Sequence, residues 1–332
     1  MCSFFSYVAG AVMVQDRYME LYGKKAEVMQ ATNTILKLGE YEFAITHPDK
    51  MIWPDMEITK LDYIQRLARL GPYMLPHTQN RYLTTIRYPE GIGGISFYQK
   101  NAPRPLPPYV RTAQDGQIRY VVLDSMPTLI WLGSLYCLEL HVSCETIGDM
   151  LPDRWILDID PSREDEPRIM EAAALAGQLL HSLGLDAVPK TSGATGVQIV
   201  MPIQRGPSFD DLRAFGKFIS EYLAARHPKL FTVERLKKDR GDKIYLDYLQ
   251  FYPGRTLAAP YPPRARPGAP VSTPLTWEEV GRNPRAADFH LLNIEDRLKA
   301  RGDLISQMKP QPLGQVIQSM NQYLKRETGP AL

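Results

Sequence analysis

Residues 155–160 read WILDID, a short run in which two carboxylates are set among large apolar side chains. In a strand, alternate side chains point to the same face, so Asp158 and Asp160 would lie side by side, with α-carbons ~6.5–7 Å apart. Two carboxylates at that spacing can share one divalent cation, and the cation would remove their mutual repulsion. A pair that faces solvent at a strand end explains these two residues equally well.

Residues 243–249, KIYLDYL, repeat the pattern with one carboxylate, Asp247. Taken alone, Asp247 is more simply explained as a salt-bridge partner. Three carboxylates from two strands, however, are the ligand set of two-metal nucleotidyl transfer, in which the metals activate a terminal hydroxyl and stabilise the leaving pyrophosphate. We therefore predict that Asp158, Asp160 and Asp247 are catalytic residues and bind metal.

Two other segments could bind phosphate. The turn KTSGATG (190–196) has two glycines that free backbone N–H groups and a serine hydroxyl, although a plain β-turn is the simpler interpretation. The basic segment 235–266 includes Arg264 and Arg266, which would share a face if that segment is extended, and guanidinium groups suit a triphosphate. A solvated loop is the alternative for that segment.

The aromatic pair Phe97 and Tyr98 stands beside Lys100. Such a platform could stack a nucleic-acid base next to a cation that holds its phosphate. Burial in the core is the more common role of any one aromatic pair.

Strand and helix patterns alternate irregularly along the chain, which favours an α+β fold with a mostly antiparallel central sheet flanked by helices. The expected strands are 41–46, 83–88, 95–100, 155–160, 187–191, 197–203 and 243–249. The expected helices are 60–70, 127–136, 164–183, 208–226, 276–281, 292–300 and 312–325. Thr59 and Ser208 are suitable N-caps, Gly71-Pro72 should end the first helix, and the Pro-, Arg- and Gly-rich residues 252–274 should be irregular.

Composition excludes several classes of protein. The chain has 332 residues, 44% of them hydrophobic, and a formal net charge of +2, which rules out the composition of a disordered chain. Three cysteines without CxxC spacing argue against a disulfide scaffold and favour the reducing cytoplasm. No apolar run reaches the roughly 20 residues of a membrane helix, so no membrane partner is expected. The apolar stretch 4–14 lacks a preceding Lys or Arg, which disfavours a signal peptide.

The segments described so far, taken in order, resemble the polymerase (primase-polymerase) domain of bacterial DNA ligase D, a member of the archaeo-eukaryotic primase superfamily that serves non-homologous end joining. The resemblance runs from about residue 41 to about residue 302. It is carried by THPDKMIWP (46–54), ITKLDY (58–63), YLTTIRYPEGIGGISFYQKNAP (82–103), LELH (138–141), WILDIDPS (155–162), PKTSGATGVQIVMPI (189–203), YLDYLQ (245–250) and LAAPYPPRARPGAPVSTPLTWEEV (257–280). We accordingly expect an N-terminal extension (1–40), a primase-polymerase domain (41–305) and a C-terminal helix and tail (306–332).

The resemblance also implies roles for individual residues. Asp158, Asp160 and Asp247 match the family's metal ligands, which hold two Mn²⁺ or Mg²⁺ ions. Lys50 and Lys60 match residues that grip the 5′-phosphate of a DNA gap or end, and Phe97 and Tyr98 match the pair that stacks on the template. The positions that match the nucleotide site are His141, Ser192, Gly193, Thr195, Gln198, Arg240, Arg264 and Arg266. The implied substrates are nucleoside triphosphates, with ribonucleotides preferred, and the implied partners are Ku and an ATP-dependent DNA ligase.

Two features depart from this pattern. Thr195 and Gln198 stand where many relatives have Lys and His, which puts nucleotide affinity in doubt, although Lys190, Arg240 or Lys243 could compensate. The ligase nucleophile motif Lys-x-Asp-Gly is absent, since residues 60–63 read KLDY, so we expect the ligase to be a separate chain. A dedicated primase and a DNA-end-binding module with weak catalysis are the alternative functions, and a nuclease would leave the basic segment without a purpose.

Overall fold

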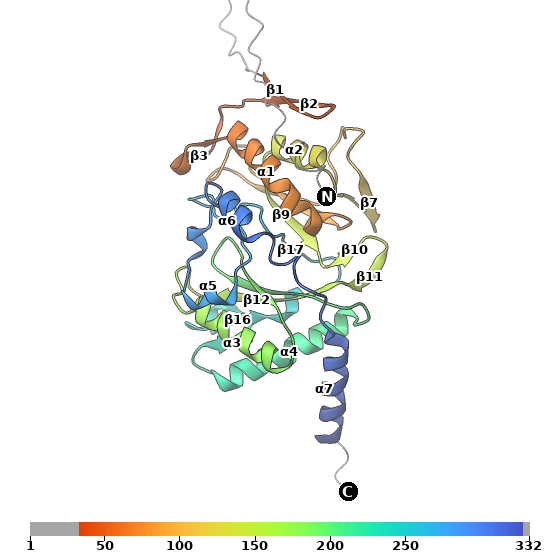
Figure 1. Ribbon diagram of the computed structural model, residues 1–332, viewed down its shortest axis with the longest axis vertical. Coiled ribbons are helices and arrows are strands. Elements are labelled where there is room, and N and C mark those ends of the chain that lie inside the picture. Colours follow the sequence, from red (N-terminus) through yellow and green to blue (C-terminus); the bar gives the residue numbers. More distant parts are fainter. Residues whose placement is uncertain (1–32, 328–332) are drawn as a thin grey trace, which may run out of the picture.

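A computed structural model describes residues 33–327, in which two large sheets lie between helices (Figure 1). The five-stranded sheet has the order β13 (Val188–Thr191), β14 (Val197–Pro202), β12 (Arg154–Pro161), β16 (Ile244–Asp247), β15 (Phe231–Thr232). The six-stranded sheet has the order β17 (Thr256–Ala258), β9 (Cys137–Ser143), β5 (Leu83–Arg87), β8 (Ile118–Val121), β7 (Thr112–Asp115), and β6 (Phe97–Gln99) also pairs with β5. All of these pairs are antiparallel except β15 with β16, which confirms the predicted α+β class.

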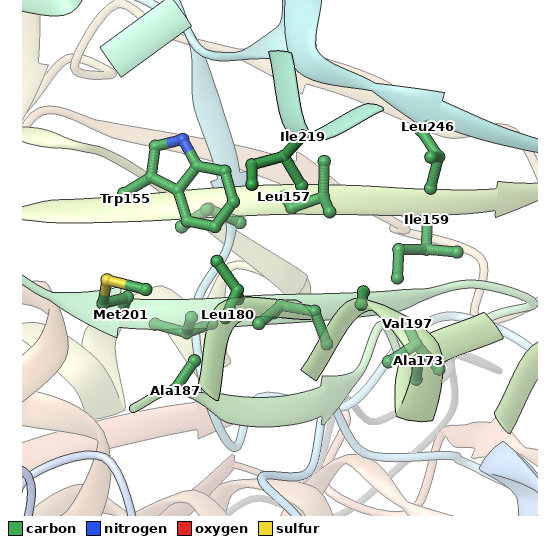
Figure 2. Close-up of a cluster of buried hydrophobic side chains, with 14 of the residues drawn as sticks. Trp155, Leu157, Ile159, Ala173, Leu180, Ala187, Val197, Met201, Ile219 and Leu246 are labelled. Atoms are coloured by element: carbon green, nitrogen blue, oxygen red, sulfur yellow. The ribbon is translucent and has the colours of Figure 1, made fainter. Parts of the chain in front are cut away.

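Each large sheet has a hydrophobic core of its own. In the first core, Trp155, Leu157 and Ile159 project from β12 toward helices that cover one face of the five-stranded sheet (Figure 2). These helices are α3 (Ile169–Ser182) and α4 (Phe209–Arg226). Because side chains alternate along a strand, Asp158 and Asp160 must point to the other face, away from these helices.

Capping explains where the helices of this layer begin. The Ser208 hydroxyl accepts the N–H of Asp211, whose carboxylate accepts the N–H of Ser208, so α4 starts where the sequence predicts. Helix α3, predicted from residue 164, begins only at Ile169. The Arg168 guanidinium is bound to Glu166 and to the carbonyl of Asp242, and these contacts hold the preceding residues in a loop.

Helix α1 (Lys60–Thr78) is longer than predicted. The Gly71-Pro72 pair does not end it, and Pro76 also lies inside the helix. Gly71 packs directly against Met126 on α2 (Met126–Ser134), where a larger side chain would collide with the methionine. This contact and the burial of Met74, one helical turn beyond Gly71, stabilise the last two turns despite the missing proline N–H groups.

Residues on both sides of each predicted domain boundary belong to the folded structure. Strand β1 (Asn33–Leu38) pairs with β2 (Tyr41–Thr46), so one hairpin crosses the boundary that the sequence places after residue 40. The apolar stretch 4–14 lies outside the described residues. Helix α7 (Leu313–Glu327) buries Leu313 and Ile317 in the first core.

Short elements complete the described part of the chain. The strands are β3 (Met51–Trp53), β4 (Ile58–Thr59), β10 (Glu145–Thr146) and β11 (Asp149–Pro152). The helices are α5 (Trp277–Gly281), α6 (Ile294–Arg301) and the 3₁₀ turns at Pro54–Met56, Lys237–Asp239, Tyr248–Gln250 and Ala286–Asp288. In residues 33–327, no helix is both long enough and apolar enough to cross a bilayer.

Candidate active site

A row of four polar residues crosses the five-stranded sheet. Lys190 on β13 faces Gln198 on β14, Gln198 faces Asp158 on β12, and Asp158 faces Asp247 on β16. Residues directly opposite each other in antiparallel strands share a face and have α-carbons about 4.5–5.5 Å apart. The register therefore places Asp247 beside Asp158, and Asp160 lies two residues along β12 on the same face.

Burial and repulsion between neighbouring carboxylates perturb Asp158 and Asp160. Asp158 is only 8% exposed, and its pKa is raised first by burial and then by the charges of Asp160 and Asp247. The pKa of Asp160 is also raised, by burial and by Asp247, while the charge of Arg240 opposes that rise. Negative charge is thus concentrated at one point of the sheet, where a bound cation would stabilise the ionised carboxylates.

Residues 33–327 contain no preassembled cluster of three or more His, Cys, Asp or Glu side chains in metal-binding geometry. The donors at this point nevertheless suit a divalent cation, because carboxylate oxygens are the ligands that Mg²⁺ and Mn²⁺ prefer. The side-chain oxygen of Gln198 is buried beside Asp158 without a hydrogen-bond partner. Both the excess negative charge and this unsatisfied oxygen would be relieved by a cation.

Asp247 has a second function in the backbone. Its Oδ1 accepts the hydroxyl of Tyr245 at 3.1 Å and the N–H groups of Leu249 and Gln250 at 3.1 and 3.2 Å. These bonds begin a 3₁₀ turn, so β16 ends at Asp247 rather than at residue 249, where the sequence predicts its end. The turn holds the third carboxylate at the end of its strand.

Lys190 is a buried cation that sequence reasoning considered only as a possible compensating residue. Its Nζ donates to the Ser272 hydroxyl at 2.5 Å and to the carbonyl of Ala258, on β17, at 3.3 Å. Burial and the nearby charge of Arg264 lower the pKa of Lys190 to about 7. Lys190 therefore ties the five-stranded sheet to the six-stranded sheet at the edge of the carboxylate site.

Arg264 also connects the two sheets. Its guanidinium donates to the carbonyl of Ser192 at 2.9 Å and lies 2.9 Å from Glu139 on β9. The approach depends on Gly193, whose φ of +70° suits glycine and where an added Cβ would lie 2.7 Å from the Cγ of Arg264. The Ser192 hydroxyl accepts the N–H groups of Ala194 and Gly196, each at 3.1 Å, which shapes the turn beside Asp160.

Glu139 is a site residue that the sequence analysis missed. Its carboxylate lies 3.1 Å from His141 Nε2 and accepts the N–H of Ala265 at 3.2 Å and the hydroxyl of Tyr88 at 3.4 Å. Burial opposes its ionisation, but the bond with His141 and the charge of Arg264 hold the pKa of Glu139 at about 2. The i, i+2 spacing of Glu139 and His141 in one strand was the available signal.

Arg264 and Arg266 would share a face if this segment were extended, but it is not extended here. The chain turns sharply between them, because the N–H of Arg266 donates to the carbonyl of Arg264 at 2.8 Å. Arg266 instead forms an ion pair with Glu164 at 3.1 Å and is half exposed. Arg240 and Lys237 also act on the carboxylates through their charges, and the Arg240 guanidinium lies 3.9 Å from the centre of the Tyr245 ring. Thr195 lies half-buried in the turn after β13.

Lys50 and Lys60 lie together at the N-terminal end of α1. The Lys60 Nζ donates to the carbonyl of Thr46 at 2.8 Å, and the Lys50 Nζ lies 2.8 Å from Glu90. Both ammonium groups stand over the ring of Tyr136. Burial and the charge of Lys50 lower the pKa of Lys60 to about 8.

The aromatic pair on β6 is exposed rather than buried. Phe97 is 42% exposed and Tyr98 is 74% exposed, so the core interpretation of this pair is wrong. The Arg87 guanidinium lies 5.2 Å from the centre of the Phe97 ring and donates to the Gln99 side chain at 3.2 Å. The platform is thereby supported from β5.

Known proteins match both the sequence and the fold. A family model described as "LigD, primase-polymerase domain" matches residues 59–305. The bifunctional non-homologous end joining protein LigD of Bacillus subtilis is 37% identical over 281 residues, which cover 83% of this chain and 46% of that protein. The multifunctional non-homologous end joining protein LigD of Pseudomonas aeruginosa is 32% identical over 260 residues, which cover 76% of this chain and 31% of that protein. The chain thus spans less than half the length of these two relatives.

A solved structure agrees with the sequence match. The polymerase domain of Mycobacterium tuberculosis ligase D, in complex with DNA, superposes with a TM-score of 0.74 and 26% identity, over 79% of this chain and 96% of that one. The family match and the shared fold identify a primase-polymerase domain, which is a polymerase-type nucleotidyltransferase. The chain belongs to the LigD primase-polymerase domain family, whose members are metal-dependent.

Proposed function

We propose that this protein adds nucleotides, preferably ribonucleotides, to DNA ends and short gaps during non-homologous end joining. The observation that carries this proposal is the strand register that sets Asp247 opposite Asp158, with Asp160 on the same face. Arg264 and Arg240 supply positive charge beside these carboxylates. Acidic and cationic groups so arranged suit a nucleoside triphosphate and the metal ions that accompany it.

Asp158, Asp160 and Asp247 would hold two Mn²⁺ or Mg²⁺ ions. When bound, such ions would activate a primer 3′-hydroxyl and neutralise the leaving pyrophosphate. Arg264 and Arg240 would bind the triphosphate oxygens, and the Ser192 hydroxyl and the backbone around Gly193 could donate to them. His141 and Gln198 would contact the nucleotide, and Arg266 would contribute only if it leaves Glu164.

DNA contacts are assigned to the N-terminal end of α1 and to β6. Lys50 and Lys60 would grip the 5′-phosphate at the far side of a gap, and Phe97 and Tyr98 would stack on the template. The exposure of both aromatic rings supports this assignment. The relative of known structure is a complex with DNA, and the relatives are named for non-homologous end joining, so Ku and a DNA ligase are the proposed partners.

The test is primer extension on a 5′-phosphorylated gapped duplex with each ribo- and deoxynucleotide, with Mn²⁺ or Mg²⁺. Asp158→Asn should lower the extension rate by about 100-fold or more, because metal charge stabilisation is worth several kcal/mol. Asp186→Asn, at an exposed aspartate outside the site, is the matched control. Extension that survives Asp158→Asn would refute the site, and binding of DNA without extension by the wild type would leave only an end-binding module.

A template supplied without a primer separates gap filling from dedicated priming. Gap filling requires an existing 3′-hydroxyl, so product should form only with the primer present. Equal product on both substrates would instead make the protein a primase.

A further inference from the structure

Two lysine ammonium groups share one aromatic ring beside α1. The Nζ of Lys60 lies 4.1 Å from the centre of the Tyr136 ring, and the Nζ of Lys50 lies 5.6 Å from it. Both distances are within the range of a cation–π interaction. The Tyr136 ring therefore contacts two positive charges that lie close to each other. Tyr136 itself belongs to a different part of the chain from either lysine.

The backbone at Tyr136 is unusual for a large residue. Its φ is +61°, and hydrogen bonds fix it on both sides: its N–H donates to Gly133, and its carbonyl accepts the N–H of Tyr88 at 2.9 Å. A non-glycine residue seldom adopts this conformation, and such residues cluster at functional sites. The tyrosine side chain is thus held at a point where glycine would be relaxed.

The local charge balance favours an anion. Among the residues that the structure describes, Glu90 is the only carboxylate that forms an ion pair with either lysine, and its side chain is 67% exposed. An exposed ion pair of this kind contributes little to stability, so a phosphate could displace Glu90 from Lys50. Lys60 is almost fully buried, with its ammonium directed at Thr46 and at the Tyr136 ring.

We propose that Tyr136 is a specificity-determining residue of the DNA-end pocket, because its ring makes Lys50 and Lys60 converge on one terminal phosphate. A phosphate monoester carries about −1.5 to −2 charges at pH 7, whereas a 5′-hydroxyl carries none at that position. Two ammonium groups held together therefore favour the phosphorylated end. This inference rests on the proposed role of Lys50 and Lys60 in binding the 5′-phosphate. It adds Tyr136 as the residue that makes the two lysines distinguish a 5′-phosphate from a 5′-hydroxyl.

The experiment measures the dissociation constants of two gapped duplexes that differ only in a 5′-phosphate or a 5′-hydroxyl at the downstream end. Fluorescence anisotropy at pH 7 gives the ratio of the two constants for each protein. Tyr136→Gly should reduce the ratio by about 5-fold or more, because the cation–π surface is gone while the backbone is relaxed. Tyr136→Phe, which keeps the aromatic ring, should have the wild-type ratio of the two dissociation constants.

Matched controls separate this inference from its premise. Tyr252→Ala removes an exposed tyrosine that contacts Arg213 elsewhere on the surface, so it should keep the wild-type ratio. Thermal unfolding of Tyr136→Gly checks that the variant is folded. If the wild type and Lys60→Ala show no preference for the phosphate, the premise fails and the inference fails with it. If the wild type prefers the phosphate, Lys60→Ala does not, and Tyr136→Gly still does, only the role of Tyr136 is overturned.

Discussion

Glu139→Gln tests whether one buried carboxylate organises the nucleotide side of the site. The side chain is 6% exposed and lies against His141 and Arg264. Its pKa is about 2, compared with an ordinary value of 4.5, and that difference corresponds to about 3 kcal/mol of stabilisation of the folded, ionised state. Replacement by glutamine removes the charge while keeping the size, so the free energy of unfolding at pH 7 should fall by about 3 kcal/mol.

The stabilisation by Glu139 should depend on pH in a defined direction. The pKa of Glu139 is depressed in the folded protein, so its stabilisation is complete above pH 4.5 and is lost as the pH falls toward 2. Urea unfolding of both proteins should therefore show a gap that is widest at neutral pH and that closes in acid. The nucleotide KM should rise more than kcat falls, because Arg264 and His141 lose their shared partner but the three aspartates are unchanged.

A second substitution controls for the general effect on stability of removing one negative charge. Glu278→Gln breaks an exposed ion pair with Arg282 and should change stability by no more than about 0.5 kcal/mol. Equal stability of wild type and Glu139→Gln at pH 7 would refute the reasoning. So would a stability gap of the same size at every pH.

Three further predictions concern the nucleotide and the DNA end. Gln198→His should lower the nucleotide KM several-fold in steady-state extension assays. The reason is that a histidine opposite Asp158 can carry a charge, whereas the side-chain oxygen of Gln198 is buried without a hydrogen-bond partner. An unchanged KM would show that position 198 does not contribute to nucleotide binding. Glu90→Gln should tighten binding of a 5′-phosphorylated duplex about 2- to 5-fold in anisotropy titrations, because the carboxylate competing for Lys50 is gone, and weaker binding would contradict that competition. Above about pH 7, where the phosphate is already mostly ionised, affinity for the same duplex should fall with rising pH, because Lys60, with a pKa of about 8, loses its proton. Lys60→Arg should flatten this fall, and a flat wild-type profile above pH 7 would exclude Lys60 as the phosphate ligand.

Local features of the fold could be predicted from the sequence because they depend on near neighbours. Alternation in WILDID places Asp158 and Asp160 on one face, and Ser208 with Asp211 starts α4. The family resemblance implied that Asp247 is the third carboxylate and that Lys50 and Lys60 act on the same phosphate, whereas spacing alone left a salt-bridge partner as the simpler interpretation of Asp247. The predicted end of α1 was wrong because packing outweighed local propensity. Gly71-Pro72 favours the end of a helix, but contact with α2 stabilises α1 beyond these residues.

The sequence by itself determined which side chains share a face of a strand and where most helices begin, because periodicity and capping act over a few residues. Only the tertiary structure decided that Asp247 pairs with Asp158, that Glu139 joins His141 to Arg264, and that Arg266 turns away. Those outcomes depend on strand register and on turns between segments far apart in the chain. Strand register depends on the packing of both hydrophobic cores as a whole, so it cannot be predicted from any short stretch of sequence.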